Sequence, residues 1–475
     1  MINTTEGGKT LKKSIILTSA LITSLISING ASAADQTAAR ESSLKQQILN
    51  ANSFITDSSI RDEKFQAMEQ SPFAFFRATN YVYYSDLGNG VIPIPAEWKS
   101  TQNISTWIEG DAHTDNVGFF DNDKGEVKFD LNDFDESYIA PFYWDLIRFS
   151  TSIFLLCDET PNVSLSDQER SDLVSSFLQT YQDTLKEVNG NSSETSVQLD
   201  EGYLSSGFVQ DQLRDAKSSD DKAKLLDKWT VTGSSGRTFD FSNSDLAPVS
   251  SGDYSAISAN WNGYKSTIDS FVQSKPSSYF TIKDIARRLH SGLGSLGVDK
   301  YYVLIEGDSS SADDDEILEI KEQRLPSMFM EGSLSQSTYD SEFTNHAQRS
   351  SIAYLAEETE VDNHLGYMTF NNKSFRVRRI SPWKEGIKAK DFNSKSDLED
   401  FVKYSAKALA YAHARADKDY STNFVDYNFE QGALDAIDVW PQFKTKVLAY
   451  SSDYYQQVKA DYSLYEDLMN NGEIK

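Results

Sequence analysis

The feature that most constrains this chain is a stretch between residues 104 and 136 in which acidic side chains alternate with large apolar ones. It reads WIEGDAHTDNVGFF and then KFDLNDFDE, and the alternation predicts short strands separated by polar turns. The apolar members indicate that the stretch is partly buried, and a buried carboxylate needs a cation or a hydrogen-bond donor as its partner. We therefore expect a functional acidic cluster rather than a solvated acidic turn.

The oxygen-rich side chains of this stretch suit a hard divalent cation. Mg²⁺ prefers a few carboxylate or amide oxygens together with water and phosphate oxygens. The candidates at strand ends and turns are Asp111, His113, Asp115, Asn116, Asp130, Asp133, Asp135 and Glu136. Zinc bound through His113 is the alternative, but the chain has only 5 His and no HExxH motif.

A second pattern combines glycines with a lysine on a strand. The segment GLGSLG contains Gly292, Gly294 and Gly297, and the strand-like segments YYVLIEG and ILEIKEQ follow, the latter with Lys321. Glycines let a backbone approach phosphates closely, and a lysine on a following strand can neutralise them. A dinucleotide-binding fold would place a strand before the glycines and a helix after them, so this order favours the glycine-rich loop of protein kinases. An ordinary glycine-rich hairpin is the alternative.

The remaining patterns predict a mixture of helices and short strands. Residues 34–86 appear mostly helical, with a helix beginning or kinked at Pro72. Two further helices are predicted at WDLIRFSTSIFLLC and DQERSDLVSSFLQTYQDTLKEV. Residues 189–278 are rich in Ser, Asp, Gly and Asn, which predicts a surface elaboration with a hairpin at KWTVTGSSGRTFDF.

After Phe280 we expect mainly strands, and then helices again. TIKDIARRL is expected to be helical or turn-like, residues 341–358 to form a helix, and GYMTF and SFRVRRI to form strands joined by a turn. From about Ser396 the pattern is helical to the end of the chain. The predicted fold class is therefore α+β.

Composition excludes several classes of protein. The 45 basic and 72 acidic residues give a formal net charge of -27, which argues against sequence-independent binding to nucleic acid. Cys157 is the one cysteine, so neither an internal disulfide framework nor a multi-thiolate metal site can form.

The N-terminal segment resembles an export signal. Lys9, Lys12 and Lys13 precede an uncharged stretch, SIILTSALITSLISING, which ends in small residues up to Ala33. This order predicts a signal peptide over residues 1–33 and a periplasmic or secreted protein without a stable membrane anchor. An uncleaved membrane anchor is the alternative, although the stretch is short for one.

Taken together, the two patterns resemble kinase-like phosphotransferases, and more closely the bacterial family named domain of unknown function 2252. The catalytic loop of aminoglycoside and choline kinases looks like HGDxHxxN, and GDAHTDN matches it with Glu109 in place of the first His. The resemblance implies that Asp111, with His113 in the same motif, orients or deprotonates an acceptor hydroxyl. It implies that Asn116 binds Mg²⁺ together with Asp133, with Asp130 and Asp135 left open.

The order of the parts implies a circular permutation, because in ordinary kinases the glycine loop and its lysine precede the catalytic loop. The implied fold is a bilobal, protein-kinase-like fold with a small, mostly antiparallel β lobe and a larger helical lobe. Its parts would be a catalytic-loop portion at 34–280, a nucleotide-binding lobe at 281–385 with Lys321, and a helical segment at 386–475. The segment ALAYAHARAD resembles the helix that precedes the catalytic loop in kinases.

Further roles follow from the same resemblance. Asp145 would support the catalytic region, and the carboxylate paired with Lys321 would be Glu342, Glu357 or Glu358. Arg77, His413 and Arg415 could contact substrate or phosphate, but structural ion pairs and helix packing are favoured for them.

The expected function is that of an exported, Mg²⁺-dependent phosphotransferase or nucleotidyltransferase that uses ATP or another nucleotide on an unknown hydroxyl acceptor. Because ATP is scarce outside the cytoplasm, two alternatives stay open: a kinase-shaped binding module without turnover, and a metal-dependent phosphoester hydrolase. A secreted adhesion protein fits the composition but predicts neither motif.

Overall fold

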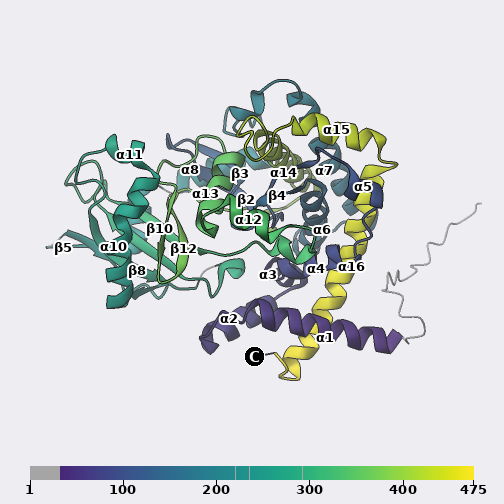
Figure 1. Cartoon of the computed structure of the whole chain (residues 1–475), viewed down its shortest axis with the longest axis horizontal. Coiled ribbons are helices and arrows are strands. Elements are labelled where there is room, and N and C mark those ends of the chain that lie inside the picture. The colour runs from purple at the N-terminus through teal and green to yellow at the C-terminus, as the bar shows by residue number, and fades with distance from the viewer. Residues whose placement is uncertain (1–32, 220, 235, 291, 475) are drawn as a thin grey trace, which may run out of the picture.

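The computed structural model describes residues 33–219, 221–234, 236–290 and 292–474. It is an α+β fold in which the paired strands run antiparallel, as the sequence predicts. A helical part lies beside a part built on a six-stranded sheet, on the right and the left of the view respectively (Figure 1). Apart from Ala33, the predicted signal peptide falls outside the described residues.

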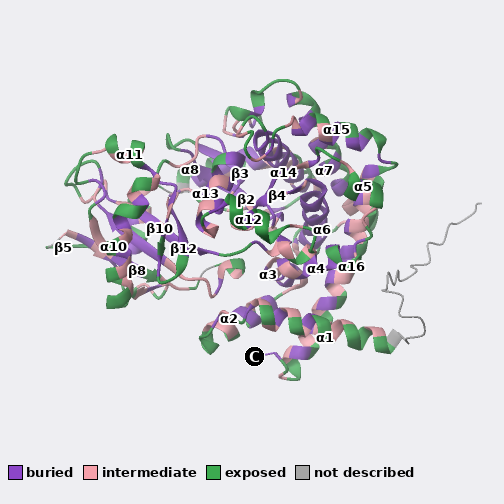
Figure 2. Cartoon of the chain, in the orientation of Figure 1, coloured by how far each residue is buried: buried purple, intermediate pink, exposed green. Residues whose placement is uncertain are grey.

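The helical part surrounds a core made by α6 (Tyr143–Glu159) and α14 (Lys395–Arg415). Because α6 is apolar on nearly all sides, it is buried along almost its whole length, as is the second half of α14 (Figure 2). The predicted start of a helix at Pro72 is confirmed, with the Ser71 hydroxyl accepting a hydrogen bond from the Ala74 N–H at 3.1 Å. The other helices of this part are α1 (Ala33–Ala51), α2 (Ser58–Met68), α3 (Pro72–Ala78), α4 (Asn80–Gly88), α5 (Ala96–Ser100), α7 (Asp167–Val188), α8 (Phe208–Ser219), α15 (Phe429–Val439) and α16 (Phe443–Asn470).

Three short strands of the helical part lie within the acidic stretch, which confirms the strand prediction there, and a fourth strand that was not predicted follows the stretch. β1 (Ser105–Ile108) pairs with β4 (Tyr138–Pro141), and β2 (Val117–Asp121) forms a hairpin with β3 (Val127–Leu131). β2 and β3 are buried at every residue. The acids at their ends are therefore held by a packed core, not by a solvated loop.

The six-stranded sheet has the order β11-β12-β10-β9-β8-β7. Because side chains alternate along a strand, Leu318 and Ile320 of β10 pack against Trp261 of α10, while Glu319 and Lys321 lie on the opposite face. The strands are β7 (Leu246–Pro248), β8 (Ile282–Arg288), β9 (Lys300–Ile305), β10 (Glu316–Gln323), β11 (Gly366–Phe370) and β12 (Lys373–Arg379). The segments around them are α9 (Lys222–Trp229), the hairpin β5 (Thr230–Gly233) and β6 (Gly236–Phe239), α10 (Ser251–Thr267), α11 (Asp269–Gln273), α12 (Gln336–Glu342) and α13 (His346–Glu357).

Two local predictions differ from the structure. TIKDIARRL, expected to be helical or turn-like, contains strand β8, because pairing with β9 buries Ile285 and Ala286 on opposite faces of the sheet. Part of residues 189–278 is not surface elaboration, since Trp261 and Tyr264 of α10 belong to the core under the sheet. The boundaries at 281 and 385 themselves stay predictions.

Other local predictions hold. The hairpin in KWTVTGSSGRTFDF is β5 and β6, and the two predicted late strands are β11 and β12. The helix expected at 341–358 is divided into α12 and α13, because Asn345 caps a new helix by accepting from the Gln348 N–H. Among the helices within the described residues, none combines the length and the apolar character needed to cross a bilayer.

Candidate active site

A close contact between two loops shapes the acidic stretch. Gly110 adopts a positive φ of 82°, and a Cβ at this position would lie 2.2 Å from the carbonyl oxygen of Glu136. The Asn132 N–H donates to the carbonyl of Asn116 at 3.0 Å. These contacts hold the loop after β1 against the loop after β3.

One cavity of about 680 Å³, called here the main cavity, collects most of the predicted site residues. It lies where the acidic stretch meets the glycine loop and the end of β10. The predicted site residues that line it are Asp111, His113, Asn116, Asp133, Gly292, Gly294 and Lys321, and Asp135 joins them. Neither Gly292 nor Gly294 has an atom within 4 Å of a Cβ built on it, so both glycines leave open space at the cavity wall.

Two predicted site residues are absent from the lining of the main cavity. Asp130 lies within β3, where it is buried with its carboxylate 3.4 Å from the Lys128 ammonium. Gly297 has a positive φ, and a Cβ there would meet the Ile55 side chain at 2.5 Å, so this glycine serves packing. We therefore leave both residues out of the proposed site.

Asp111 is held by an arginine that the sequence analysis did not single out. Arg148 of α6 donates from Nε to Asp111 Oδ1 at 2.9 Å, and its guanidinium lies 4.1 Å from the ring centroid of Phe76. Burial raises the pKa of Asp111 to about 7, although the charge of Arg148 opposes the shift. Asp111 is thus a fixed carboxyl group that changes its protonation state near neutral pH.

His113 lies beside Asp111. Burial, with the cations Arg77 and Arg148 nearby, holds the pKa of His113 well below its ordinary value, so the ring is neutral at pH 7. Its Nδ1 accepts from the Asp115 N–H at 3.2 Å, which leaves the proton on Nε2, 3.7 Å from Asp111 Oδ2. His113 therefore presents an N–H toward the carboxylate side of the cavity.

Asp145 supports the loop, as predicted. Its carboxylate accepts from the N–H groups of Glu109 at 2.8 Å and Gly110 at 3.2 Å, and it lies 3.2 Å from Nε2 of His413. His413 is fully buried and also bonds the Tyr181 hydroxyl, so it fills the structural role that the sequence analysis favours. Arg415 likewise donates to the backbone carbonyl of Glu194 at 3.1 Å.

Lys321 faces the acidic loop across the cavity. Its Nζ lies 3.4 Å from Asp133 Oδ2 and also contacts the Asp135 carboxylate. Lys321 and Asp133 are 188 positions apart in the sequence. Burial alone would lower the pKa of Lys321, but the carboxylates of Asp133 and Asp135 raise it above its ordinary value. Lys321 therefore carries its positive charge at neutral pH.

The expected partners of Lys321 were wrong. Glu342 accepts from the Tyr138 hydroxyl at 3.0 Å, and Glu357 is buried in contact with Ser137. Glu358 lies in a different cavity, near Lys128. Lys321 is paired by the acidic loop itself, so no carboxylate from α13 is needed.

Helix α13 contributes an arginine to the site instead. Arg349 is fully buried and donates to the carbonyls of Asp135 at 2.7 Å, Ser137 at 2.9 Å and Arg324 at 3.2 Å. Arg376 of β12 binds the Asp135 carboxylate from a neighbouring strand. These two arginines fix the acidic loop against the sheet.

The sequence did carry a signal for some of these residues. Arg148 stands alone in the apolar helix WDLIRFSTSIFLLC, and a buried arginine must find a carboxylate or carbonyl partner. It lies one helical turn after Asp145, on the same side of α6. No comparable signal marks Arg349 or Arg376, whose partners are far away in sequence.

The donor set fits a magnesium ion bound partly by phosphate. In the described part of the chain, no group of three or more His, Cys, Asp or Glu is arranged to hold a metal. Asn116 uses its Nδ2 to donate to the Asp111 carbonyl at 3.1 Å, and its Oδ1, which has no hydrogen bond from any described residue, is available as a ligand. Asp133 is partly exposed to the same cavity. Two oxygen ligands completed by water and phosphate are a common arrangement for Mg²⁺.

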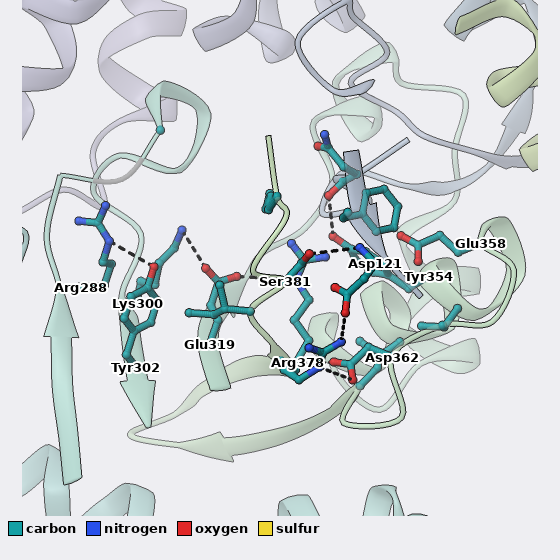
Figure 3. A pocket seen from close by; sticks show the side chains of 18 residues that line it. Asp121, Arg288, Lys300, Tyr302, Glu319, Tyr354, Glu358, Asp362, Arg378 and Ser381 are labelled. Carbon is teal, nitrogen blue, oxygen red and sulfur yellow. Dashed lines mark hydrogen bonds and ion pairs between the residues drawn. The ribbon is translucent and has the colours of Figure 1, made fainter. Parts of the chain in front are cut away.

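A second cavity of about 240 Å³ lies on the same face of the sheet and shares Gly292 with the main cavity. Figure 3 shows that its charged groups face one another. Lys300 lies 3.3 Å from Glu319, and Arg379 contacts Asp121 and lies 3.8 Å from Asp362. Glu358 and Lys384 line the same cavity without an ion pair among the described residues, so its charges are only partly paired.

Comparison with known proteins shows the family to which the chain belongs, but that family has no assigned activity. Residues 58–468 match the family model described as "Uncharacterized protein conserved in bacteria (DUF2252)". The chain belongs to this family. No curated protein and no solved structure matches the chain.

Proposed function

We propose that this DUF2252 protein is a Mg²⁺-dependent phosphotransferase that moves a phosphoryl group from ATP to an acceptor hydroxyl. The observation that carries the proposal is the contact of Lys321 with Asp133, since it unites the lysine strand and the acidic loop at one cavity. In kinase-like enzymes a lysine on a strand after the glycine loop and a metal-binding Asp hold the same triphosphate.

The order of elements supports a kinase-like fold with a permuted chain. β8, the glycine loop, β9 and β10 with Lys321 follow one another as the first strands of a kinase do, and helices α12 and α13 come after them. The acidic loop, which lies downstream in a kinase, precedes them here. Contacts between α14 and β1 bring the later helical segment back to the start of the catalytic loop.

The chain's residues take distinct roles in this proposal. The ionised Asp111 accepts the proton of the acceptor hydroxyl as its oxygen bonds to the γ-phosphorus, and the bond to the leaving ADP oxygen breaks. Lys321 and the backbone of Gly292 and Gly294 hold the phosphates. Mg²⁺, held by Asn116 and Asp133, would supply charge neutralisation when bound.

The nucleotide base is assigned to the second cavity. Gly292 lines both cavities, so a nucleotide under the glycine loop could extend from one to the other. Tyr302 and Tyr354 also line the second cavity, although they are only 7% and 1% exposed and the Tyr354 ring contacts the guanidinium groups of Arg376 and Arg378. This placement leaves the larger main cavity to the phosphates and the acceptor.

A binding module without turnover is the second candidate, and the pairing of Asp111 with Arg148 favours it. The charge of Arg148 opposes the rise that burial causes in the pKa of Asp111, so the carboxylate is a weaker base than it would be without this arginine. Turnover of labelled ATP in the presence of hydroxyl acceptors separates this candidate from the first. A metal-dependent hydrolase would instead act on phosphoesters without any nucleotide.

Nucleotide binding is the direct test of the proposal. We expect MgADP at about 100 times its Kd to stabilise the protein by about 2.7 kcal/mol, measured as a rise in the thermal unfolding midpoint. ADP with EDTA should give a clearly smaller rise, because the phosphates then lack their cation. No stabilisation by MgADP or by a non-hydrolysable MgATP analogue would refute both the phosphotransferase and the binding module.

The pKa of Asp111 predicts how activity depends on pH. Because burial raises the pKa of Asp111 to about 7 and the ionised form is the active one, kcat/KM should fall as pH decreases through about 7. Above that pH the carboxylate is charged and the rate should level off. The profile is measured with excess Mg²⁺, so that the nucleotide stays ionised, and a flat profile between about pH 6 and 8 would contradict the role of Asp111 as base.

A further inference from the structure

The main cavity has a second wall, remote in sequence from the acidic stretch. It is formed by the end of α1, by α2 and by the segment that follows β10. Its members include Phe54, Lys64, Arg324, Leu325, Phe329, Met330 and Leu334. The proposed chemistry uses none of these residues.

Lys64 is the unusual member of this wall. It is only 5% exposed, and within the residues that the structure describes its ammonium has no hydrogen bond and no ion pair. Burial lowers the pKa of Lys64 to about 8, with the charge of Arg324 acting in the same direction and Glu136 opposing it. Lys64 therefore carries a charge at pH 7 in a place where charge is unfavourable without a partner.

Arg324 lies close to Lys64. Its guanidinium is 3.7 Å from the ring centroid of Phe54, and the Lys64 ammonium is 6.0 Å from the same ring. The nearest carboxylate of Arg324 is that of Glu322, at 3.7 Å, and Glu322 is also bound by Lys373 at 2.8 Å. Arg324 thus shares its carboxylate with Lys373, and Glu136, which lines the same cavity, attracts Lys64 without an ion pair among the described residues.

The same wall exposes apolar surface. Leu325 is 37% and Met330 is 52% exposed, which places them among the few large hydrophobic side chains left open to solvent. Phe54, Phe329 and Leu334 are half-buried beside them. Apolar residues around the buried ammonium of Lys64 form a surface that complements an amphipathic anion.

We propose that the main cavity binds an amphipathic anion, whose charged group pairs with Lys64 and whose apolar body lies on Leu325 and Met330. On the proposed function, this molecule is the acceptor, with its hydroxyl directed toward Asp111. The unpaired Lys64 costs stability in the free protein and is compensated when the ligand binds.

Octanoate, octan-1-ol and octylammonium are the probes, each tested without nucleotide by ligand-observed NMR titration. We expect octanoate to bind most tightly and Lys64→Met to weaken it by at least about tenfold, since one buried charge pair is lost. The affinity for octan-1-ol should be nearly the same in Lys64→Met as in the wild type, because octan-1-ol carries no charge. The matched control is Lys99→Met, which removes an exposed lysine of α5 that does not line the cavity.

A second variant and a second readout guard against simple misfolding. Lys64→Met should unfold at the same or a higher temperature than the wild type, because an unpaired buried charge is removed. Met330→Glu, at an exposed position, should also weaken octanoate through charge repulsion without changing stability. A loss of octanoate binding accompanied by a lower unfolding temperature in both variants would contradict the proposal.

The outcomes separate this inference from the phosphotransferase itself. MgADP should bind wild type and Lys64→Met equally; if its affinity falls in the variant, Lys64 belongs to the nucleotide site and the inference fails. If the wild type binds octanoate no better than octanol or octylammonium, the inference also fails, whatever MgADP does. If octanoate binds as expected and MgADP does not bind, the anion site stands and the proposed function falls.

Discussion

Replacing Asp111 by Asn should lower the turnover number for phosphoryl transfer by about a thousandfold, within the range that a lost general base costs. The amide has nearly the same shape, so it can still accept the hydrogen bond from Arg148 Nε, but it cannot take a proton from the acceptor hydroxyl. MgADP affinity should change little, because Asp111 acts on the acceptor and not on the nucleotide. Single-turnover transfer from labelled ATP and calorimetric binding of MgADP measure the two quantities.

The control for Asp111→Asn is Asp123→Asn, which removes an exposed carboxylate in the turn between β2 and β3. It should leave both turnover and binding unchanged. The thermal unfolding midpoint of Asp111→Asn checks that the loss of the carboxylate charge beside Arg148 does not destabilise the fold. Wild-type turnover in a folded Asp111→Asn protein would remove this residue from the mechanism and point to another base.

Replacing Lys321 by Met should weaken MgADP binding by about 100-fold, because one charge-assisted contact to phosphate is lost. The loss also leaves the carboxylates of Asp133 and Asp135 less neutralised at the cavity, and they then repel the phosphates. Isothermal titration calorimetry at fixed ionic strength measures the change. The fall in kcat/KM should follow the fall in affinity.

Lys228→Met is the matched control, since Lys228 is an exposed lysine on α9, which covers the same sheet. It should bind MgADP as the wild type does. Lys321→Arg should recover part of the affinity, because the charge returns with a different shape. Unchanged MgADP affinity in Lys321→Met would mean that the contact of Lys321 with the acidic loop is purely structural.

The sequence predicted the local character of the site well. The alternation of acids with Trp107, Phe119 and Phe129 predicts buried strands with acids at their ends, and the structure has β1, β2 and β3 there. Two strands are predicted after the glycines, the second of them with Lys321, and β9 and β10 are these strands. These predictions succeed because hydrophobic periodicity and turn residues act within a few residues of one another.

The sequence could not predict which distant side chains meet. Three carboxylates in FDLNDFD were open for the site, and Asp133 and Asp135 contact Lys321 while Asp130 does not. Asp130 lies inside β3, where the strand fixes its side chain beside Lys128, whereas the other two lie in the loop after the strand. Which of the three carboxylates reaches Lys321 depends on where β3 ends relative to β10, and no local sequence pattern predicts that position.

The amino-acid sequence by itself determined the residue types of the acidic loop, the glycine loop and the lysine strand, and the α+β class. Only the tertiary structure decided that these segments share one cavity, that Arg148 holds Asp111, and that Lys64 lies in the cavity wall without an ion pair to any described residue. The physical reason is that backbone preferences act between near neighbours, while burial and charge pairing depend on which surfaces the whole chain brings into contact.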